Sequence, residues 1–502
     1  MKISFIPVIA AILLLASCTQ QKQETEEQLF EKSVTFPKEA TLEEKAGFAS
    51  RVTPTPQQLA WQKLEMTAFI HFGINTFTNR EWGDGKESPS LFNPVDFDAE
   101  QWVKALQAGG MKMLILTAKH HDGFCLWPTV TTDHSVASSP WHGGKGDVVK
   151  EVKAACDKYG MKFGVYLSPW DRNAPAYGDS PRYNDMFVQQ LTELLSNYGK
   201  IDEVWFDGAC GEGPNGKQQE YDWEAYYEVI RRLQPEAVTA IEGEEIRWVG
   251  TESGYGRPTE WSVTAYAPGA RAANKAINAE LGLTAMSEDL GSRNVLAKAA
   301  GAWWYPAEVD VSIRPGWFWH EAENEHVKSL EKLVDIYFNS VGMNAVLLLN
   351  VPPDNRGLIN EADVARLKEF GDWIRNTFGN NPIAGARSVN KNAAAAIDGN
   401  PGTCWRTSKL PETAEFRFPE PVAFDIIELQ ELIEKGQRVE AFKVEAFTDG
   451  EWKEIGSGTT IGYKRLLRCD VTETDKIRIT IEAARGEALI SAIGLYKAGP
   501  KE

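Results

Sequence analysis

The sequence has little positive charge and little cysteine. Its 502 residues include 53 Lys and Arg against 71 Asp and Glu, which gives a formal net charge of -18. This excess of negative charge argues against electrostatic binding of nucleic acid, whose phosphates attract basic surfaces. Five of the six cysteines are scattered, at Cys125, Cys156, Cys210, Cys404 and Cys469. Such a set predicts no disulfide framework, although Cys404 and Cys469 could pair.

Long apolar runs are missing except at the N-terminus. Residues 3–15 are mostly apolar and lead into "LASC", which ends at Cys18. The run is too short for a stable membrane span and is typical of a signal peptide. Small residues before a cysteine resemble a bacterial lipoprotein processing site, so we expect residues 1–18 to be a signal peptide and Cys18 to carry lipid. An ordinary signal peptide that contains a cysteine is the alternative.

The segment after Cys18 is polar and poor in apolar residues, beginning with "TQQKQETEEQ". Such a composition predicts a flexible tether, which we place over residues 19–50. The protein is therefore expected to be an exported bacterial lipoprotein, periplasmic or on the cell surface. Its only contact with the membrane would be the lipid anchor.

Short apolar segments alternate with amphipathic ones over about 300 residues. The expected strands are residues 66–73, 111–120, 161–170, 201–208, 237–243 and 344–353. The expected helices are residues 98–110, 146–160, 186–199, 224–235 and 326–342. Repeated strand–helix units predict a parallel sheet covered by helices. A (β/α)8-type barrel over residues 51–380 fits the length, and a doubly wound sheet is disfavoured because no Gly-rich phosphate loop follows the first strand.

The character of the chain changes near Pro382. Residues 384–502 form short alternating segments that turn residues separate at regular intervals. This pattern predicts a separate all-β sandwich.

Polar and aromatic residues recur where the barrel strands end, which is where barrel enzymes build their active sites. They are His71 on the first strand, His120, His121 and Asp122 on the second, Tyr166 and Trp170 on the third, Trp205 and Asp207 on the fourth, and Trp248 and Glu252 after the fifth. A single strand-end histidine is often only structural, but recurrence on successive strands indicates an active site.

Two reaction types fit these residues. A metallohydrolase would use His71, His120, His121 and Asp207 as ligands. Barrel metallohydrolases usually open with H-x-H on the first strand, whereas this strand offers only His71. Adjacent histidines on a strand also point to opposite faces unless the strand bulges. Glycoside hydrolysis needs two carboxyl groups and no metal, with polar and aromatic side chains to hold the sugar.

Several segments, in order, resemble the α-L-fucosidases of glycoside hydrolase family 29. They are "FIHFGINTFTNREWGDG", "AKHHDGF", "GVYLSPWDRN", "EVWFDGA" and "SIRPGWFWH". The similarity spans about residues 69–353, nearly the whole predicted barrel. The tail, with "AIDGNPGTCWRTS", resembles a discoidin-type β-sandwich, a class that is sometimes a carbohydrate-binding module and sometimes only a packing domain.

The resemblance implies a retaining exo-α-L-fucosidase that works by double displacement and needs no metal or cofactor. Asp207 of "WFDG" would be the nucleophile. The acid/base candidates are Glu252, Glu260, Glu288 and Glu308. Glu252 leads because "WVGTESGY" resembles a segment of the α-1,3/1,4-preferring subgroup, and Glu308 is second. Another retaining exo-glycosidase on the same barrel remains an alternative.

The resemblance also implies which residues bind the sugar. His120 and His121 would donate hydrogen bonds to fucose hydroxyls, with a bulge at the strand end that lets both approach. The other implied sugar-binding residues are His71, Glu81, Trp82, Tyr166, Trp205, Arg247 and Trp317. The expected partners are fucosylated oligosaccharides or glycoconjugates, on Lewis-type branches if the subgroup holds.

Overall fold

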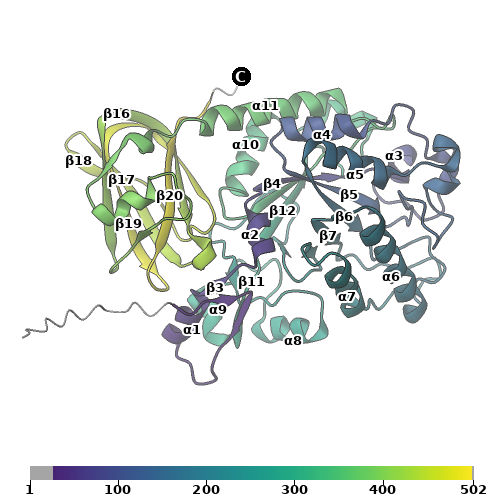
Figure 1. Cartoon of the computed structure of the whole chain (residues 1–502), viewed down its shortest axis with the longest axis horizontal. Helices are drawn as coiled ribbons and strands as arrows, with labels where there is room; N and C mark the ends of the chain where they lie inside the picture. The colour runs from purple at the N-terminus through teal and green to yellow at the C-terminus, as the bar shows by residue number, and fades with distance from the viewer. Residues whose placement is uncertain (1–26, 500–502) are drawn as a thin grey trace, which may run out of the picture.

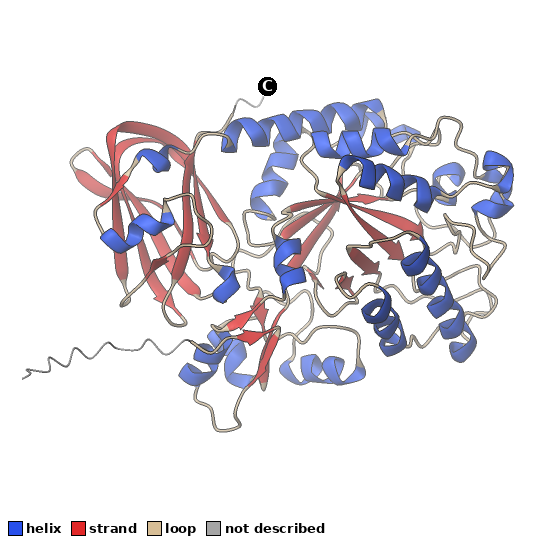
Figure 2. Ribbon diagram, in the orientation of Figure 1, coloured by secondary structure: helices blue, strands red, loops and turns tan. Residues whose placement is uncertain are grey.

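The computed structural model describes residues 27–499. The predicted signal peptide, the lipidation site Cys18 and the first part of the predicted tether lie outside these residues. Within residues 27–499, no helix is long and apolar enough to span a membrane. A helix-covered barrel and a smaller all-β unit lie side by side (Figures 1 and 2).

The larger unit is built on eight parallel strands, as the alternation of segments predicts. Their order is β8-β7-β6-β5-β4-β13-β12-β9, and a bridge between Ala240 and Ile246 brings β8 and β9 together at the seam. The strands are β4 (Met66–Ile70), β5 (Met113–Lys119), β6 (Lys162–Leu167), β7 (Glu203–Phe206), β8 (Val238–Ile241), β9 (Arg247–Trp248), β12 (Ala307–Ser312) and β13 (Val346–Asn350). The (β/α)8-type fold is therefore confirmed.

Alternation along the strands divides the apolar side chains between two layers. On β5, Met113 and Ile115 face the barrel interior, whereas Leu114 and Leu116 pack under the helices. Both layers are apolar, so these strands are continuous hydrophobic runs rather than alternating ones. The main covering helices are α4 (Ala99–Ala108), α5 (Val148–Tyr159), α6 (Ser180–Asn197), α7 (Trp223–Leu233), α10 (Leu330–Asn339) and α11 (Glu361–Phe378).

The start of the described chain is folded, which corrects the predicted extent of the tether. Residues 30–49 form β1 (Phe30–Glu31), β2 (Ser33–Thr35) and α1 (Leu42–Ala49), and β2 pairs with β11 (Gly301–Trp304), which in turn pairs with β10 (Val263–Thr264). Thr41 and Glu44 form a capping box at the start of α1. Phe30, Phe36 and Phe48 supply the apolar contacts that hold the segment in place.

The C-terminal unit is an antiparallel sheet, which confirms the all-β prediction. Its strands run in the order β15-β20-β16-β19-β17-β18, and β14 also pairs with β16. They are β14 (Arg387–Ser388), β15 (Trp405–Arg406), β16 (Glu412–Glu431), β17 (Val439–Thr448), β18 (Glu451–Gly458), β19 (Arg465–Ala484) and β20 (Leu489–Tyr496). The long strands β16 and β19 change register where they bend, and the sheet buries one apolar core.

The suggested pairing of Cys404 with Cys469 is wrong, because both thiols are free. Cys404 lies near Arg406 and Arg438. Cys469 instead borders a cavity that Val334, Phe338 and Trp373 of the barrel also line.

Candidate active site

One cavity at the carboxyl ends of the barrel strands is lined by Asp207, by Glu252 and by every predicted sugar-binding residue except Arg247. Asp122, Trp170 and Trp248, also expected at strand ends, do not line it. It has a volume of about 190 Å³. Its lining residues are Phe69, His71, Glu81, Trp82, His120, His121, Tyr166, Trp205, Asp207, Ala209, Glu252, Asp310 and Trp317.

Asp207 directly follows β7, and several groups orient its carboxylate. Oδ1 accepts a hydrogen bond of 2.7 Å from the backbone N–H of Ala209. Oδ2 accepts one of 3.1 Å from the Tyr166 hydroxyl. Nε2 of His121 lies 3.8 Å from Oδ2, beyond hydrogen-bonding distance. Burial and the nearby Asp207 raise the pKa of Tyr166 well above its usual value, so this hydroxyl keeps its proton and donates.

The two adjacent histidines both reach the cavity. The pairing of β5 with β6 shifts register between Thr117 and Lys119, where the strand ends just before His120. Such a bulge lets neighbouring side chains leave the strict alternation of a strand. The imidazole rings of His120 and His121 lie 4.1 Å apart, and both line the cavity.

Hydrogen bonds set the tautomers of His71 and His121. Nδ1 of His71 lies 2.8 Å from Oδ1 of Asn350, whose amide nitrogen donates to the carbonyl of Trp317. Nδ1 of His121 lies 2.8 Å from Oγ of Ser168, which donates its own hydrogen to a backbone carbonyl. In each case Nδ1 carries the hydrogen, and Nε2 of the neutral ring is left with a lone pair.

All three histidines are neutral near pH 7, because burial lowers their pKa values. The pKa of His71 falls to about 3, that of His120 falls well below its usual value, and that of His121 is also lowered. A neutral ring with its hydrogen on Nδ1 accepts at Nε2. At His71 and His121 the cavity therefore offers acceptors, which for His121 is the opposite polarity from the donor that we expected. The donor role of His120 stays a prediction.

Glu81 organises one wall of the cavity. Its carboxylate accepts hydrogen bonds from the backbone N–H groups of Trp317, at 2.8 Å, and Phe318, at 3.1 Å, and lies 2.7 Å from Nε2 of His320. Trp82 is 56% exposed, and its indole meets the His121 ring edge to face. Glu81 therefore holds the segment that carries Trp317, while Trp82 offers an open aromatic face to a ligand.

Glu252 lies in the loop that follows β9, and its side chain is exposed. Its Oε2 accepts a hydrogen bond of 3.2 Å from the indole N–H of Trp317. Asp207, just after β7, and Glu252, in the loop after β9, thus line the same cavity.

The other acid/base candidates lie outside the cavity. Glu308 is completely buried in the barrel interior, and Glu288 is an exposed residue that does not line the cavity. Glu260 is buried between Arg247 and Arg257. Arg247, which we expected at the sugar, is instead the partner of Glu260 and donates to the Tyr305 carbonyl.

Sequence reasoning missed Asp310, a fourth carboxyl group in the cavity beside Glu81, Asp207 and Glu252. It lies on β12 and accepts a hydrogen bond of 2.8 Å from the indole N–H of Trp248. Burial raises its pKa to about 7. Alternation along "AEVDVS", residues 307–312, would have placed Asp310 on the same face as Glu308. The two acidic residues interrupt the apolar pattern, so the segment was not recognised as a strand.

A pair of glutamates lies inside the barrel beneath the cavity. Glu203 accepts from the indole of Trp61 and Glu308 from the indole of Trp205, each at 2.8 Å. Burial, and the proximity of Glu203, raise the pKa of Glu308 well above its usual value, and burial raises that of Glu203 to about 8. The pair therefore holds protons at neutral pH, and Glu308 fixes the indole of Trp205 at the cavity.

This pair predicts a pH dependence of stability. The folded protein keeps protons that the unfolded chain releases above about pH 4.5, so stability is lost as pH rises from about 4.5 to about 8. Each retained proton changes the free energy of unfolding by about 1.4 kcal/mol per pH unit in that window. Glu308→Gln should therefore gain stability relative to the parent between pH 5 and pH 8, measured as the difference in Tm. The exposed Glu288→Gln is the control, and an equal pH trend in both variants would contradict the assignment.

The described part of the chain contains no cluster of metal ligands that would support the metallohydrolase alternative. Across residues 27–499, no three His, Cys, Asp or Glu side chains are grouped so that they could hold a metal ion. His71 and His121 instead hydrogen-bond to an amide and a hydroxyl.

Comparison with known proteins identifies both units. The alpha-L-fucosidase family model matches residues 48–378, and the F5/8 type C domain model matches residues 381–493. Alpha-L-fucosidase 1 of Arabidopsis thaliana is 42% identical over 463 residues, which cover 88% of this chain and 87% of the plant protein.

Solved structures support the same family assignment. A crystal structure from Bacteroides ovatus ATCC 8483, provisionally assigned as an alpha-L-fucosidase, is 59% identical with a TM-score of 0.89, covering 94% of this chain and 79% of that one. A Ruminococcus gnavus family 29 fucosidase in complex with fucose is 35% identical with a TM-score of 0.77, covering 90% and 96%. The chain therefore belongs to the alpha-L-fucosidases of glycoside hydrolase family 29 and carries an F5/8 type C, discoidin-like domain after its catalytic barrel.

Proposed function

We propose that this α-L-fucosidase is a retaining exo-enzyme that releases L-fucose from α-1,3- or α-1,4-linked branches of Lewis-type glycans. The observation that carries the proposal is that Asp207 and Glu252 line one cavity from the segments that follow β7 and β9. Glycoside hydrolysis needs two such carboxyl groups, and a retaining enzyme places them about 5–5.5 Å apart. The linkage rests on "WVGTESGY", residues 248–255, which resembles the subgroup with that preference.

In the first step, Asp207 attacks C1 of fucose while Glu252 protonates the glycosidic oxygen. The C1–O bond to the leaving sugar breaks as the bond from C1 to the Asp207 carboxylate forms. The N–H of Ala209 and the hydroxyl of Tyr166 keep the attacking carboxylate in place.

In the second step, water replaces the leaving sugar. Glu252, now ionised, takes a proton from this water, whose oxygen attacks C1 and releases Asp207. Two inversions at C1 restore the original anomer, so fucose leaves in the α form.

Recognition of fucose rests on the same cavity. We assign His71, His120 and His121 to the sugar hydroxyls, and Trp82 to the apolar face of the ring. The Ruminococcus gnavus relative was solved with fucose, which supports this sugar as the ligand. A sugar that leaves a buried acceptor unpaired would bind and react poorly.

Two substrates assayed side by side test the proposal: a Lewis-type trisaccharide and an aryl α-L-fucoside, each with and without EDTA. We expect strong release of fucose from the trisaccharide, weak cleavage of the aryl fucoside and no effect of EDTA. Cleavage of the aryl fucoside alone would remove the linkage preference and the main argument for Glu252. Loss of activity with EDTA would instead support the metallohydrolase alternative.

The protein is further proposed to be a lipoprotein at the periplasmic or outer surface of a bacterial membrane. The argument is the sequence around Cys18, which precedes the described residues. Lipid labelling in cells checks it, because Cys18→Ser should abolish incorporation of labelled fatty acid and release the enzyme from the membrane fraction.

A further inference from the structure

The β-sandwich contacts the loop that carries Glu252. This loop, residues 249–262, joins β9 to β10 and is called the Glu252 loop below. Discoidin-like domains are sometimes sugar-binding, but Trp405 of this sandwich is fully buried in its core. The polar contacts of the sandwich indicate a role at the Glu252 loop rather than in sugar binding.

Two threonines of the sandwich bind the end of the Glu252 loop. Oγ1 of Thr459 lies 2.8 Å from Oγ1 of Thr259, and Oγ1 of Thr460 accepts the backbone N–H of Glu260 at 3.1 Å. Arg465 donates to the carbonyl of Pro258 at 2.7 Å. Thr460 is 1% exposed, whereas the hydrogen bond between Thr459 and Thr259 lies at the surface.

Gln437 of the sandwich binds the next part of the loop with both ends of its amide. Its oxygen accepts the N–H of Ser262 at 2.7 Å, and its nitrogen donates to the carbonyl of Glu260 at 3.0 Å. Gln437 is completely buried. A buried amide with both ends paired fixes position strongly, because either bond can be broken only by leaving a buried group unpaired.

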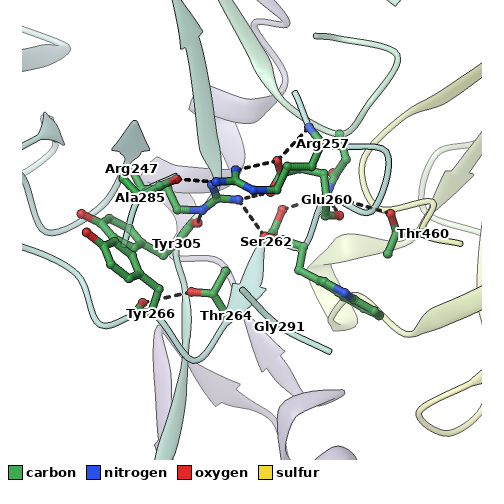
Figure 3. Close-up of polar contacts among 12 residues, drawn as sticks. Arg247, Arg257, Glu260, Ser262, Thr264, Tyr266, Ala285, Gly291, Tyr305 and Thr460 are labelled. Atoms are coloured by element: carbon green, nitrogen blue, oxygen red, sulfur yellow. Dashed lines mark hydrogen bonds and ion pairs between the residues drawn. The ribbon is translucent and has the colours of Figure 1, made fainter. Parts of the chain in front are cut away.

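Glu260 closes the base of the loop on the barrel side. Its carboxylate forms ion pairs with Arg247, on β9 just before the loop, and with Arg257 inside it (Figure 3). All three charged groups are buried or nearly so. Figure 3 shows Thr460 of the sandwich reaching the same glutamate from the other side. The two ends of the loop are therefore tied together at one residue that the sandwich holds.

A second connection reaches closer to Glu252. The Tyr255 hydroxyl donates to Asp335 on α10 at 2.6 Å, and Arg468 of β19 donates to the other oxygen of Asp335 at 3.1 Å. Gly254 packs so closely that a Cβ there would lie 3.0 Å from Ile336 of the same helix. Residues two and three positions after Glu252 are thus fixed on α10, and the sandwich braces that helix.

We propose that the C-terminal β-sandwich is a positioning element for Glu252, so that the catalytic barrel depends on it for acid catalysis. The inference rests on the proposed function, in which Glu252 is the acid/base. A displacement of about 1 Å in a catalytic group can lower a rate by about 100-fold. Loosening the sandwich contacts should therefore impair proton donation more than it impairs the attack by Asp207.

The test is the double variant Thr459→Val/Thr460→Val, which keeps the side-chain shape and removes both hydroxyls. Its control is Tyr463→Phe, which removes one hydroxyl that bonds Glu65 at 3.0 Å, a sandwich–barrel contact away from the loop. The readout is kcat/KM on two substrates. The Lewis-type trisaccharide needs a proton on its leaving oxygen, whereas α-L-fucosyl fluoride needs little acid help.

We expect the double variant to lose about tenfold on the trisaccharide and less than about twofold on the fluoride, with Tyr463→Phe close to the parent on both. Equal losses on the two substrates, or no loss, would overturn the proposal. Arg468→Gln is the second variant, because Arg468 is partly exposed and its removal leaves the barrel core intact. It should give a smaller loss with the same preference for the trisaccharide, and a uniform loss would count against the role.

Glu252→Ala, assayed in parallel, separates this inference from the proposed function. Glu252→Ala could lose more activity on the trisaccharide than on the fluoride while Thr459→Val/Thr460→Val does not. In that case only the positioning role fails. If Glu252→Ala loses both substrates equally, the acid/base assignment fails, and the positioning role fails with it.

Discussion

Asp207→Gly should abolish turnover of fucosyl substrates, with kcat lowered by about 10⁴-fold or more. Without the carboxylate, no covalent fucosyl-enzyme can form. The space that opens would let azide attack C1 directly, so added azide should partly restore cleavage of α-L-fucosyl fluoride. Direct attack inverts C1, and the product should be β-fucosyl azide. Product analysis by NMR identifies the anomer.

The control for Asp207 is Glu242→Gln, the carboxyl group that follows β8 and lies beside Gly208 but does not line the cavity. It should keep most of its activity. A loss of turnover in Asp207→Gly without any azide rescue would leave the nucleophile assignment without support. An α-azide product from this variant would contradict it.

Glu252→Ala should show a loss that depends on the leaving group. On the Lewis-type trisaccharide, kcat/KM should fall by roughly 10²–10⁴-fold, because general acid catalysis contributes about that much. On α-L-fucosyl fluoride, kcat/KM should change little, because fluoride departs without a proton. The fucosyl-enzyme would still form on Asp207, and azide would capture it in a second inversion to give α-fucosyl azide.

The opposite anomers expected from the two variants distinguish the nucleophile from the acid/base in one assay. Glu288→Ala is the matched control for Glu252, since Glu288 is also an exposed glutamate outside the core. It should behave like the parent enzyme on both substrates. Similar losses for Glu252→Ala on trisaccharide and fluoride would indicate that Glu252 only holds Trp317.

The barrel was predictable where its strands are apolar on both faces. The strands that precede His71, His121 and Asp207 fit that pattern, and their ends converge in one cavity, as expected for a parallel barrel. Strand β9 has two residues, and β12 buries Glu308 and Asp310 inside the barrel. Neither gives an apolar run, and both were missed for that reason.

Other features depend on partners that are distant in the sequence. Arg247 was expected at the sugar because the resemblance to family 29 implied it. Its partner, Glu260, lies 13 residues later and turns it into a structural group. The tautomer of His71 depends on Asn350, 279 residues away. Residue type and spacing predict which side chains line a cavity, but the direction of a hydrogen bond requires the fold.

The neutral imidazoles of the cavity have a consequence for analogues of fucose. Nε2 of His71 and Nε2 of His121 can each receive a hydrogen and cannot give one. A fluorine atom in place of a sugar hydroxyl keeps nearly the same size and polarity but has no hydrogen to offer. In a fluorinated fucoside, the lone pairs of fluorine would face the lone pair on Nε2 of His71 or His121. The enzyme would then reject such sugars for the loss of one proton rather than for their shape.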